Sequence, residues 1–164
     1  ALKLKRFEDE TFDITLLFGP MYHLFGQEDK VKALKEAARI TKKGGFILVA
    51  YVMNEYGVIT YAFKERHIKE CMEQGRLTEN FHTISSEQDL YDYVRLEDIA
   101  KVNEAAGCGR EKIVTPDGPA NYIRQFVNQL DEDEFEMFYR YHLATCERAD
   151  LLGAAAHTLD ILRK

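Results

Sequence analysis

The feature that most constrains the fold is an unbroken run of mainly apolar residues, Ile14 to Phe18, in the stretch FDITLLFGPMYHL. Uninterrupted runs with β-branched and aromatic members are typical of strands that are covered on both faces, and such strands are usually parallel. Gly19 and Pro20 end the run. Ligands of open α/β sheets bind beyond the carboxyl ends of strands, so we expect the following loop, with Tyr22 and His23, to carry the functional site.

A helix and a second strand are predicted directly after this loop. Apolar residues recur at helical spacing over Gln27–Ile40, acidic residues occupy the first turn, and Lys42–Gly45 signal the end of the helix. Phe46–Val52, FILVAYV, is a second continuous apolar run. The order strand, helix, strand with short connections predicts two neighbouring parallel strands joined by a right-handed crossover.

The segment Met53–Phe81 has a different character, because aromatic residues alternate irregularly with charged ones. We expect one or two irregular helices ending near Gly75, forming a lid over the loop at Gly19–Leu24, since lids commonly follow the carboxyl end of a strand. For Asn80–Val94 we expect a loop with a short extended piece.

The second half of the chain mixes helical and strand signals. Helical spacing predicts helices over Leu96–Ala106, Ala120–Leu130 and Asp133–Ala149, and a strand is predicted over Lys112–Thr115. For His157–Arg163 the alternation favours a strand and the preceding alanines favour a helix, so the pattern leaves both open.

Length and charge limit the class of protein. A chain of 164 residues with 46% hydrophobic residues is typical of one globular domain. The net charge of -6 argues against a nucleic-acid backbone or an anionic membrane surface as the main partner and favours a small molecule. No apolar run approaches the ~20 residues of a membrane-spanning helix, and the first residues lack the apolar core of a signal peptide.

The cysteines and the other metal-ligating residues do not form a recognisable site. Cys71, Cys108 and Cys146 are odd in number and widely spaced, which indicates a reducing cytoplasmic location rather than a disulfide framework or a zinc site. His142 and Cys146 are four residues apart, a spacing compatible with a metal but more typical of packing. The acidic run Asp131–Glu134 is typical of a helix N-terminus. No metal site is expected.

Taken together, these motifs resemble the later half of the class I S-adenosylmethionine-dependent methyltransferases. In that family a Phe-Asp pair opens the fourth strand, a loop of the type Gly-Pro-Leu-Tyr-His-Leu follows, and a helix ending in Lys/Arg-Pro-Gly-Gly leads into the fifth strand. The corresponding residues here are Phe12-Asp13, Gly19–Leu24 with Met21 for leucine, and Lys42–Gly45 with a lysine for proline.

The resemblance implies an α/β fold, a partial Rossmann-like methyltransferase sheet made of the equivalents of strands four to seven, with helices on its faces and a helical lid insertion at residues 53–81. It covers nearly the whole chain, as a single truncated domain spanning residues 1–164, and implies that His157–Arg163 is the antiparallel seventh strand. The implied activity is transfer of a methyl group from S-adenosylmethionine to a small-molecule acceptor. Cofactor contacts are implied at Ala1, Leu2, Phe18, Gly19 and Pro20, with the methionine end beside Phe18 and Gly19.

One part of the family pattern is absent. The glycine-rich loop after the family's first strand, together with its acidic ribose partner, has no counterpart in this sequence. We therefore expect a truncated methyltransferase, with cofactor binding a property of the full-length form. The alternative is a non-catalytic fragment or oligomerisation module. A nicotinamide-dependent enzyme on a similar sheet is disfavoured by the same lack of a glycine-rich turn.

The expected catalytic residues are Tyr22 and His23. Methyl transfer from a sulfonium needs the nucleophile held in line, so few catalytic groups are required. The ring of Tyr22 is suited to face a sulfonium, and His23 is suited to accept a proton from the acceptor. The same two residues, with Tyr56 and Tyr61 from the lid, are expected to bind the substrate, and Phe63, Tyr91 and Tyr93 are further candidates. Both groups have a structural alternative, in which they only pack the lid and the core.

The truncation has a consequence for assembly. If the family's first three strands are missing, the strand at 14–18 lies at the edge of the sheet and presents unpaired backbone groups to water. We expect a two-fold homodimer in which two such strands pair antiparallel. The alternative is a monomer whose N-terminal segment, with Lys3, Lys5 and Arg6, shields the edge.

Overall fold

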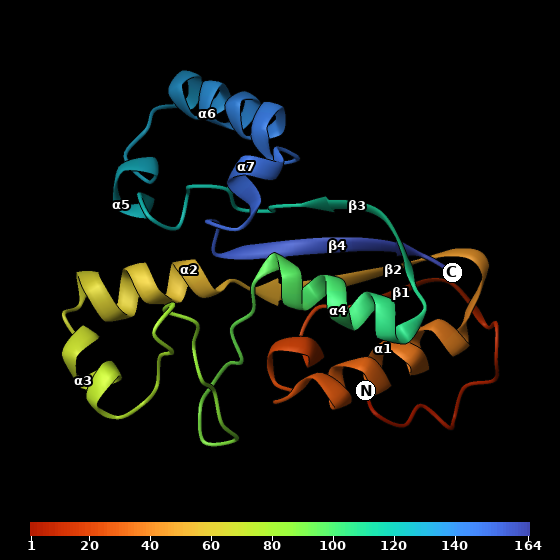
Figure 1. Ribbon diagram of the computed structural model, residues 1–164. Helices are drawn as coiled ribbons and strands as arrows, with labels where there is room; N and C mark the ends of the chain where they lie inside the picture. The colour runs from red at the N-terminus through yellow and green to blue at the C-terminus, as the bar shows by residue number, and fades with distance from the viewer.

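The computed structural model describes residues 1–164, and Figure 1 shows a central sheet with helices grouped around it. Helices α1 and α4 lie side by side along the sheet, α2 and α3 lie at one end, and α5 to α7 lie beyond β3. The elements in chain order are β1 (Phe12–Leu17), η1 (Pro20–Tyr22), α1 (Gln27–Ile40), β2 (Thr41–Val52), α2 (Asn54–Gly57), η2 (Val58–Lys64), α3 (Ile68–Glu73), α4 (Leu96–Ala106), β3 (Gly109–Val114), α5 (Arg124–Val127), α6 (Glu132–Thr145), α7 (Ala149–Leu152) and β4 (His157–Arg163).

The four strands form one sheet in the order β1-β2-β4-β3. β1 and β2 are parallel and are connected through α1, which confirms the predicted strand, helix, strand unit. β4 runs antiparallel to both of its neighbours, β2 and β3. His157–Arg163, which the pattern left open, is therefore a strand, as the family resemblance implied, and the predicted α/β sheet is confirmed.

One face of the sheet is buried beneath α1 and α4. Ile47, Val49 and Tyr51 of β2 are at most 1% exposed and belong to one apolar cluster with Leu34 of α1 and Ile99 of α4. Both helices were predicted with these bounds, because each has an apolar stripe that needs a partner. Burying one large aliphatic side chain contributes about 1.5–3 kcal/mol, so this layer supplies most of the core.

The opposite face of the sheet, here called the open face, lacks such a cover. Ile14 and Leu16 of β1 are 57% and 56% exposed, and their neighbours across the sheet, Phe46 and Leu48 of β2, are only partly buried. The expectation that β1 is covered on both faces is wrong for this chain, because α1 and α4 pack on the other face and β1 is an edge strand.

The N-terminal segment packs against α1. The backbone nitrogen of Leu4 donates to Glu36 over 2.8 Å, and Arg39 donates to the carbonyl oxygens of Leu4 and Phe7. These bonds explain why the segment follows the helix and leaves Ile14 exposed.

β2 begins five residues earlier than predicted, at Thr41 instead of Phe46. Gly44 has a positive φ of 75°, and the pairing of β1 with β2 shifts register between Phe12 and Ile14. A Cβ on Gly45 would lie 2.6 Å from the carbonyl oxygen of Asp13, so only glycine allows the strands to approach there. The Gly-Gly pair, expected to end the helix, is therefore an irregularity within the strand.

Residues 53–81 form short, irregular helices, as predicted. α2 continues directly into η2, which is a π-helix, and α3 follows after a turn. Gly75, with a φ of 65°, lies just after α3. π-Helical turns are rare and occur frequently at functional sites, which makes this segment a candidate wall of the site.

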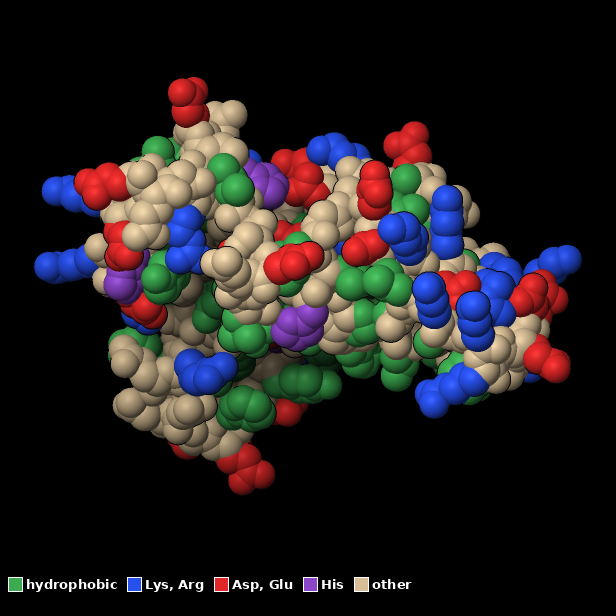
Figure 2. Space-filling model, turned by 90° about the horizontal axis from the view of Figure 1, so that it is seen from below, with side chains coloured by type: hydrophobic (Ala, Val, Ile, Leu, Met, Phe, Trp, Pro, Cys, Tyr) green, Lys and Arg blue, Asp and Glu red, His purple; other side chains and the backbone are tan.

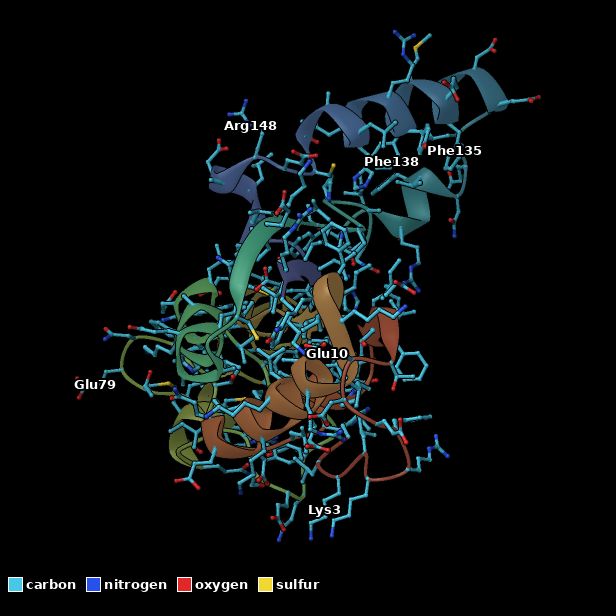
Figure 3. All side chains as sticks on the ribbon, turned by 90° about the vertical axis from the view of Figure 1, so that its right-hand side faces the viewer. Lys3, Glu10, Glu79, Phe135, Phe138 and Arg148 are labelled. Atoms are coloured by element: carbon cyan, nitrogen blue, oxygen red, sulfur yellow. The ribbon has the colours of Figure 1, made fainter.

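The region between β3 and β4 differs most from the prediction. Of the helix expected over Ala120–Leu130, only Arg124–Val127 is helical, because Asp117 holds the preceding residues in turns by accepting from Asn121 and from the backbone and ring of His157. α6 begins at Glu132, with Asp131 accepting from the backbone of Glu134. Figure 3 shows α6, with Phe135 and Phe138 labelled, at the opposite end of the molecule from Lys3.

A buried ionic network joins β3, β4 and α4. The carboxylate of Asp160, which is fully buried, accepts hydrogen bonds of 2.7 and 2.8 Å from Arg110 and one of 2.7 Å from Asn103. The hydrogen bond to Asp160 raises the pKa of Arg110, although partial burial opposes the shift. This network fixes the register of the two last strands against the helix.

The surface carries no continuous basic face in the view of Figure 2, where Lys and Arg side chains gather at one end but alternate with acidic ones. The same view shows a hollow with hydrophobic side chains at its rim. None of the helices has both the length and the apolar character needed to cross a membrane.

Candidate active site

The loop after β1 is anchored in the core on one side and open to solvent on the other. Pro20 occupies the first turn of η1, where its missing N–H leaves no donor unsatisfied. Met21 is fully buried in the main core, and the neighbouring Tyr22 and His23 project away from it, Tyr22 partly and His23 largely exposed. The buried methionine therefore fixes the position of the two predicted catalytic side chains.

His23 is held by a segment that is distant in sequence. Its Nδ1 lies 3.0 Å from the carbonyl oxygen of Leu90. The ring of Tyr91 lies 5.4 Å from the ring of His23 and 5.5 Å from the ring of Tyr22, between centroids. The backbone nitrogen of Asp92 donates to the carbonyl oxygen of Tyr22 over 2.9 Å. Residues 90–92 thus form the second wall of the site.

A buried ion pair locks this wall to α1. The side chain of Lys30 is 3% exposed, and its ammonium group donates to the carboxylate of Asp92 and to the carbonyl oxygen of Leu24. A lysine is buried in this way only when its charge is paired and hydrogen-bonded. The pair connects both ends of the site, the loop after β1 and residues 90–92.

A cavity of about 330 Å³ lies behind the second wall, between residues 57–77 and residues 83–93. Its apolar lining comes mainly from Val58, Ala62, Leu77, Ile84 and Leu90, and three tyrosines complete it: Tyr61, Tyr91 and Tyr93. Arg76 and Asp89 form an ion pair in its wall. Since Tyr91 lines the cavity and also contacts His23, the cavity and the loop meet at this residue.

The cavity wall is tied to α2 through Asn54 and to α4 through His82. Asn54 is fully buried, donates to the carbonyl oxygen of Phe81 and accepts from the backbone of Thr83 over 2.8 Å. His82 Nε2 lies 2.7 Å from a carboxylate oxygen of Asp98 in the first turn of α4. Two elements of the fold thus hold residues 81–83 in place.

His82 and Asp98 each stabilise the charged form of the other. Burial opposes the charged form of His82, but the hydrogen bond to Asp98, the hydrogen bond to the backbone of Thr83 and the charge of Asp98 together outweigh it and raise the pKa of His82. Burial likewise opposes the charged form of Asp98, and the hydrogen bonds from His82 and from the backbone of Arg95 outweigh it and lower the pKa of Asp98. The charged pair is therefore favoured below the raised pKa of His82.

The predicted site residues fall into two groups. Phe18, Gly19 and Pro20 lie with Tyr22 and His23 at the end of β1, where Phe18 is 46% exposed. Ala1 and Leu2 belong to the N-terminal segment, with Leu2 packed against the main core.

The tyrosines predicted from the lid also separate. Tyr61 lines the cavity and stacks on His67 with ring centroids 4.4 Å apart, whereas Tyr56 packs against Tyr122 at 5.0 Å. Phe63 packs against Phe81. The aromatic ring that contacts Tyr22 and His23 is Tyr91, which sequence reasoning considered only as one of several pocket residues.

Metal-ligating side chains do not cluster, since no group of three or more His, Cys, Asp or Glu side chains is placed to hold an ion. The residues of the site present an imidazole, tyrosine hydroxyls and aromatic faces next to an apolar cavity.

The first part of the chain matches a known protein family. Residues 1–49 match the sequence model of a family described as "Methyltransferase domain". No curated protein matches the chain significantly. The family match covers β1, the loop with Tyr22 and His23, α1 and most of β2.

Solved structures resemble the chain along almost its whole length. A SAM-dependent methyltransferase of Thermotoga maritima, described as a possible histamine N-methyltransferase, is 19% identical with a TM-score of 0.52, and 99% of this chain and 60% of that chain are covered. A SAM-dependent methyltransferase of Methanosarcina mazei is 9% identical with a TM-score of 0.56, covering 99% and 63%. The geranyl diphosphate C-methyltransferase of Streptomyces coelicolor, in complex with Mg²⁺, geranyl diphosphate and S-adenosyl-L-homocysteine, is 11% identical with a TM-score of 0.50, covering 99% and 50%.

At these identities the likeness shows the fold, and the chain spans less than two thirds of the length of each of these structures. The resemblance that the sequence motifs predicted is confirmed at this level. The protein has the fold of the class I S-adenosylmethionine-dependent methyltransferases, and its first 49 residues match a methyltransferase domain.

Proposed function

We propose that this chain serves methyl transfer from S-adenosylmethionine to a small-molecule acceptor, as the C-terminal part of a methyltransferase. The observation that carries the proposal is the cavity of about 330 Å³ that meets the loop after β1 at Tyr91. Mostly apolar cavities with a few polar groups are the usual form of small-molecule sites. The structures with which the chain shares its fold include one that holds S-adenosyl-L-homocysteine and an organic substrate.

The residues at the end of β1 fit one end of the cofactor. There is free space beside Gly19, because the atom nearest to the position that a Cβ would take is the Tyr22 hydroxyl oxygen, at 4.0 Å. Phe18 is half exposed beside it. We place the methionine end of S-adenosylmethionine at Phe18, Gly19 and Pro20, with Ala1 and Leu2 as further contacts, and the glycine-rich loop that would cradle the rest is absent from these residues.

S-adenosylmethionine supplies a methyl group made electrophilic by the sulfonium. The chain's own residues then have two tasks, to position the acceptor and to receive its proton. We assign positioning to Tyr22, Tyr61 and the cavity, and the proton to His23, because its imidazole lies at the junction of loop and cavity. Tyr56 is assigned only an indirect part in substrate binding, because its own ring packs on Tyr122.

The hydrogen bond of His23 determines which nitrogen is free to act as the base. A carbonyl oxygen only accepts, so the Nδ1 of neutral His23 carries the hydrogen and donates to Leu90 over 3.0 Å. Its Nε2 then keeps a lone pair that is available to the acceptor's proton.

We therefore expect His23 to be in the Nδ1–H form when neutral. Long-range proton–nitrogen correlation NMR at a pH well above the titration of the ring distinguishes the two tautomers, and a His23→Gln variant assigns the signal. A spectrum that places the hydrogen on Nε2 would remove His23 as the base, because its free nitrogen would then face Leu90.

Cofactor binding tests the function itself. Calorimetric titration of the 164-residue chain with S-adenosylmethionine separates the two candidate functions, because binding in the micromolar range would reject a non-catalytic fragment. Lack of binding by this chain would favour the second candidate, a non-catalytic fragment or oligomerisation module of the same fold. The open edge and face of the sheet are the observations that support that candidate.

We further propose that residues 1–164 act as one domain in which residues 53–81 form a lid. The support is that Val58, Tyr61 and Leu77 line the cavity, and that π-helix η2 interrupts the α/β alternation just after β2. The expected contact of Tyr56, Tyr61 or Phe63 with the catalytic pair is replaced by that of Tyr91, so the lid closes over the cavity rather than directly over His23.

Two further properties belong to this proposal. We infer a homodimer formed through the edge strand at residues 14–18, because that edge is unpaired and its Ile14 and Leu16 are exposed. We also infer a cytoplasmic location, which fits three cysteines that form no disulfide.

A further inference from the structure

The cavity next to His23 contains a charged pair whose two members differ in their free hydrogen-bonding capacity. Arg76 uses one nitrogen, Nη2, to donate to Asp89 Oδ1, and its other N–H groups have no acceptor among the side chains. Asp89 is fully engaged, because Oδ2 accepts from both the backbone nitrogen of Ser86 over 2.8 Å and its hydroxyl over 3.0 Å. The pair therefore offers donors to a ligand and few acceptors.

The other polar groups of the cavity have the same bias. Tyr61, Tyr91 and Tyr93 line it, their hydroxyls make no hydrogen bond within the fold, and a hydroxyl can donate to an anion. Hydrogen bonds donated to Asp89 by the backbone and hydroxyl of Ser86, together with the charge of Arg76, lower the pKa of Asp89, so this carboxylate stays ionised and offers no donor of its own. An ammonium group would find only an occupied carboxylate here.

We infer that the cavity takes a small molecule with an apolar or aromatic body and one anionic oxygen group, a carboxylate or phosphate, which Arg76 binds. This inference rests on the proposed function and names the class of methyl acceptor. Guanidinium groups bind such anions through short, charge-assisted hydrogen bonds.

The remaining lining accounts for the body of the ligand. Val58, Leu77, Ile84 and Leu90 present an apolar surface, with tyrosine rings beside it. Arg76 itself is 44% exposed, which places its guanidinium at the mouth of the cavity rather than in its depth. A ligand with its anion at Arg76 and its body inside lies against Tyr91, which contacts His23.

The test compares three probes that share one aromatic body: phenylacetate, phenethylamine and phenethyl alcohol. Binding to the 164-residue chain is measured by titration calorimetry and by saturation-transfer NMR. We expect phenylacetate to bind at least about tenfold more tightly than the other two, a difference typical of one charge-assisted contact. Equal affinities, tighter binding of phenethylamine, or no binding of phenylacetate would each overturn the inference.

Two variants break the same ion pair with opposite expected results. Arg76→Gln should weaken phenylacetate binding about tenfold, because the anion loses its partner. Asp89→Asn should strengthen it, because the guanidinium is freed and an asparagine oxygen can still accept from Ser86. Equal weakening by both variants would show that the pair only maintains the wall and would reject the inference.

Lys69→Gln serves as the matched control, since Lys69 is an exposed cation of α3 that lies outside the cavity lining. It should leave phenylacetate binding unchanged. The S-adenosylmethionine titration is performed on the same samples. If the chain binds phenylacetate but not S-adenosylmethionine, only the proposed cofactor binding is refuted. If it binds S-adenosylmethionine but not phenylacetate, only the proposed class of acceptor is refuted.

Discussion

Replacing Asp160 with asparagine is expected to lower the free energy of unfolding by about 3 kcal/mol, the cost of breaking a buried ion pair from one side. Asp160 has no exposed surface and accepts from Arg110 twice and from Asn103 once. An asparagine supplies a single acceptor oxygen, so its amide hydrogens would face the donors of Arg110 or Asn103. The guanidinium of Arg110 would also lose its counter-charge. Equilibrium unfolding in urea measures the loss.

The chain contains a matched control for this change. Asp150 also forms an ion pair with an arginine, Arg148, but both side chains are exposed and the pair is local in sequence. Pairs of that kind contribute little, so Asp150→Asn should leave the urea midpoint where it is. If the two substitutions shifted the midpoint equally, the network around Asp160 would not be a determinant of stability.

Replacing Leu16 with lysine is expected to convert the proposed homodimer to a monomer. In an antiparallel pairing of residues 14–18 about a two-fold axis, the central residue Leu16 lies opposite its own copy in the partner. Two lysines would then face each other across the pair, and like charges directly opposite in a sheet are destabilising. The open face would in addition lose an apolar side chain that is 56% exposed in one copy.

Light scattering after size exclusion measures this change as a fall from twice 19.0 kDa to 19.0 kDa. Leu143→Lys is the matched control, because Leu143 on α6 is 55% exposed and lies away from the edge strand. It should leave the mass unchanged. An unmodified chain of 19.0 kDa at tens of micromolar would reject the homodimer.

The sequence predicted those parts of the fold that depend on local signals. The bounds of α1 and α4 were correct, because each helix has an apolar stripe and acidic residues in its first turn, and α4 also has a glycine at its end. Gly107, for example, ends α4 with a φ of 72°, a conformation that glycine adopts without strain. The helix predicted over Ala120–Leu130 was mostly wrong, because Asp117 and His157, 40 residues apart, hold that region in turns.

The sequence likewise predicted only the part of the candidate site that depends on local signals. Tyr22 and His23 were recognisable because they follow a strand and match a family motif. Their neighbours were not, since His23 contacts Leu90 across 67 residues and Lys30 pairs with Asp92 across 62. Lys30 is buried, although lysines are mostly exposed in folded proteins. No periodicity encodes a partner that lies in another loop.

β4 occupies the middle of the sheet between β2 and β3, although it is the last of the four strands along the chain. A ribosome makes a protein from its N-terminus, so β2 and β3 are both complete before the strand that pairs with each of them exists. Until residue 163 has been synthesised, one edge of the apolar strand β2 has no partner, β3 has no partner at all, and the counter-charge of Arg110 is missing. Production of this protein in cells should therefore be sensitive to chaperones that shield such segments during synthesis.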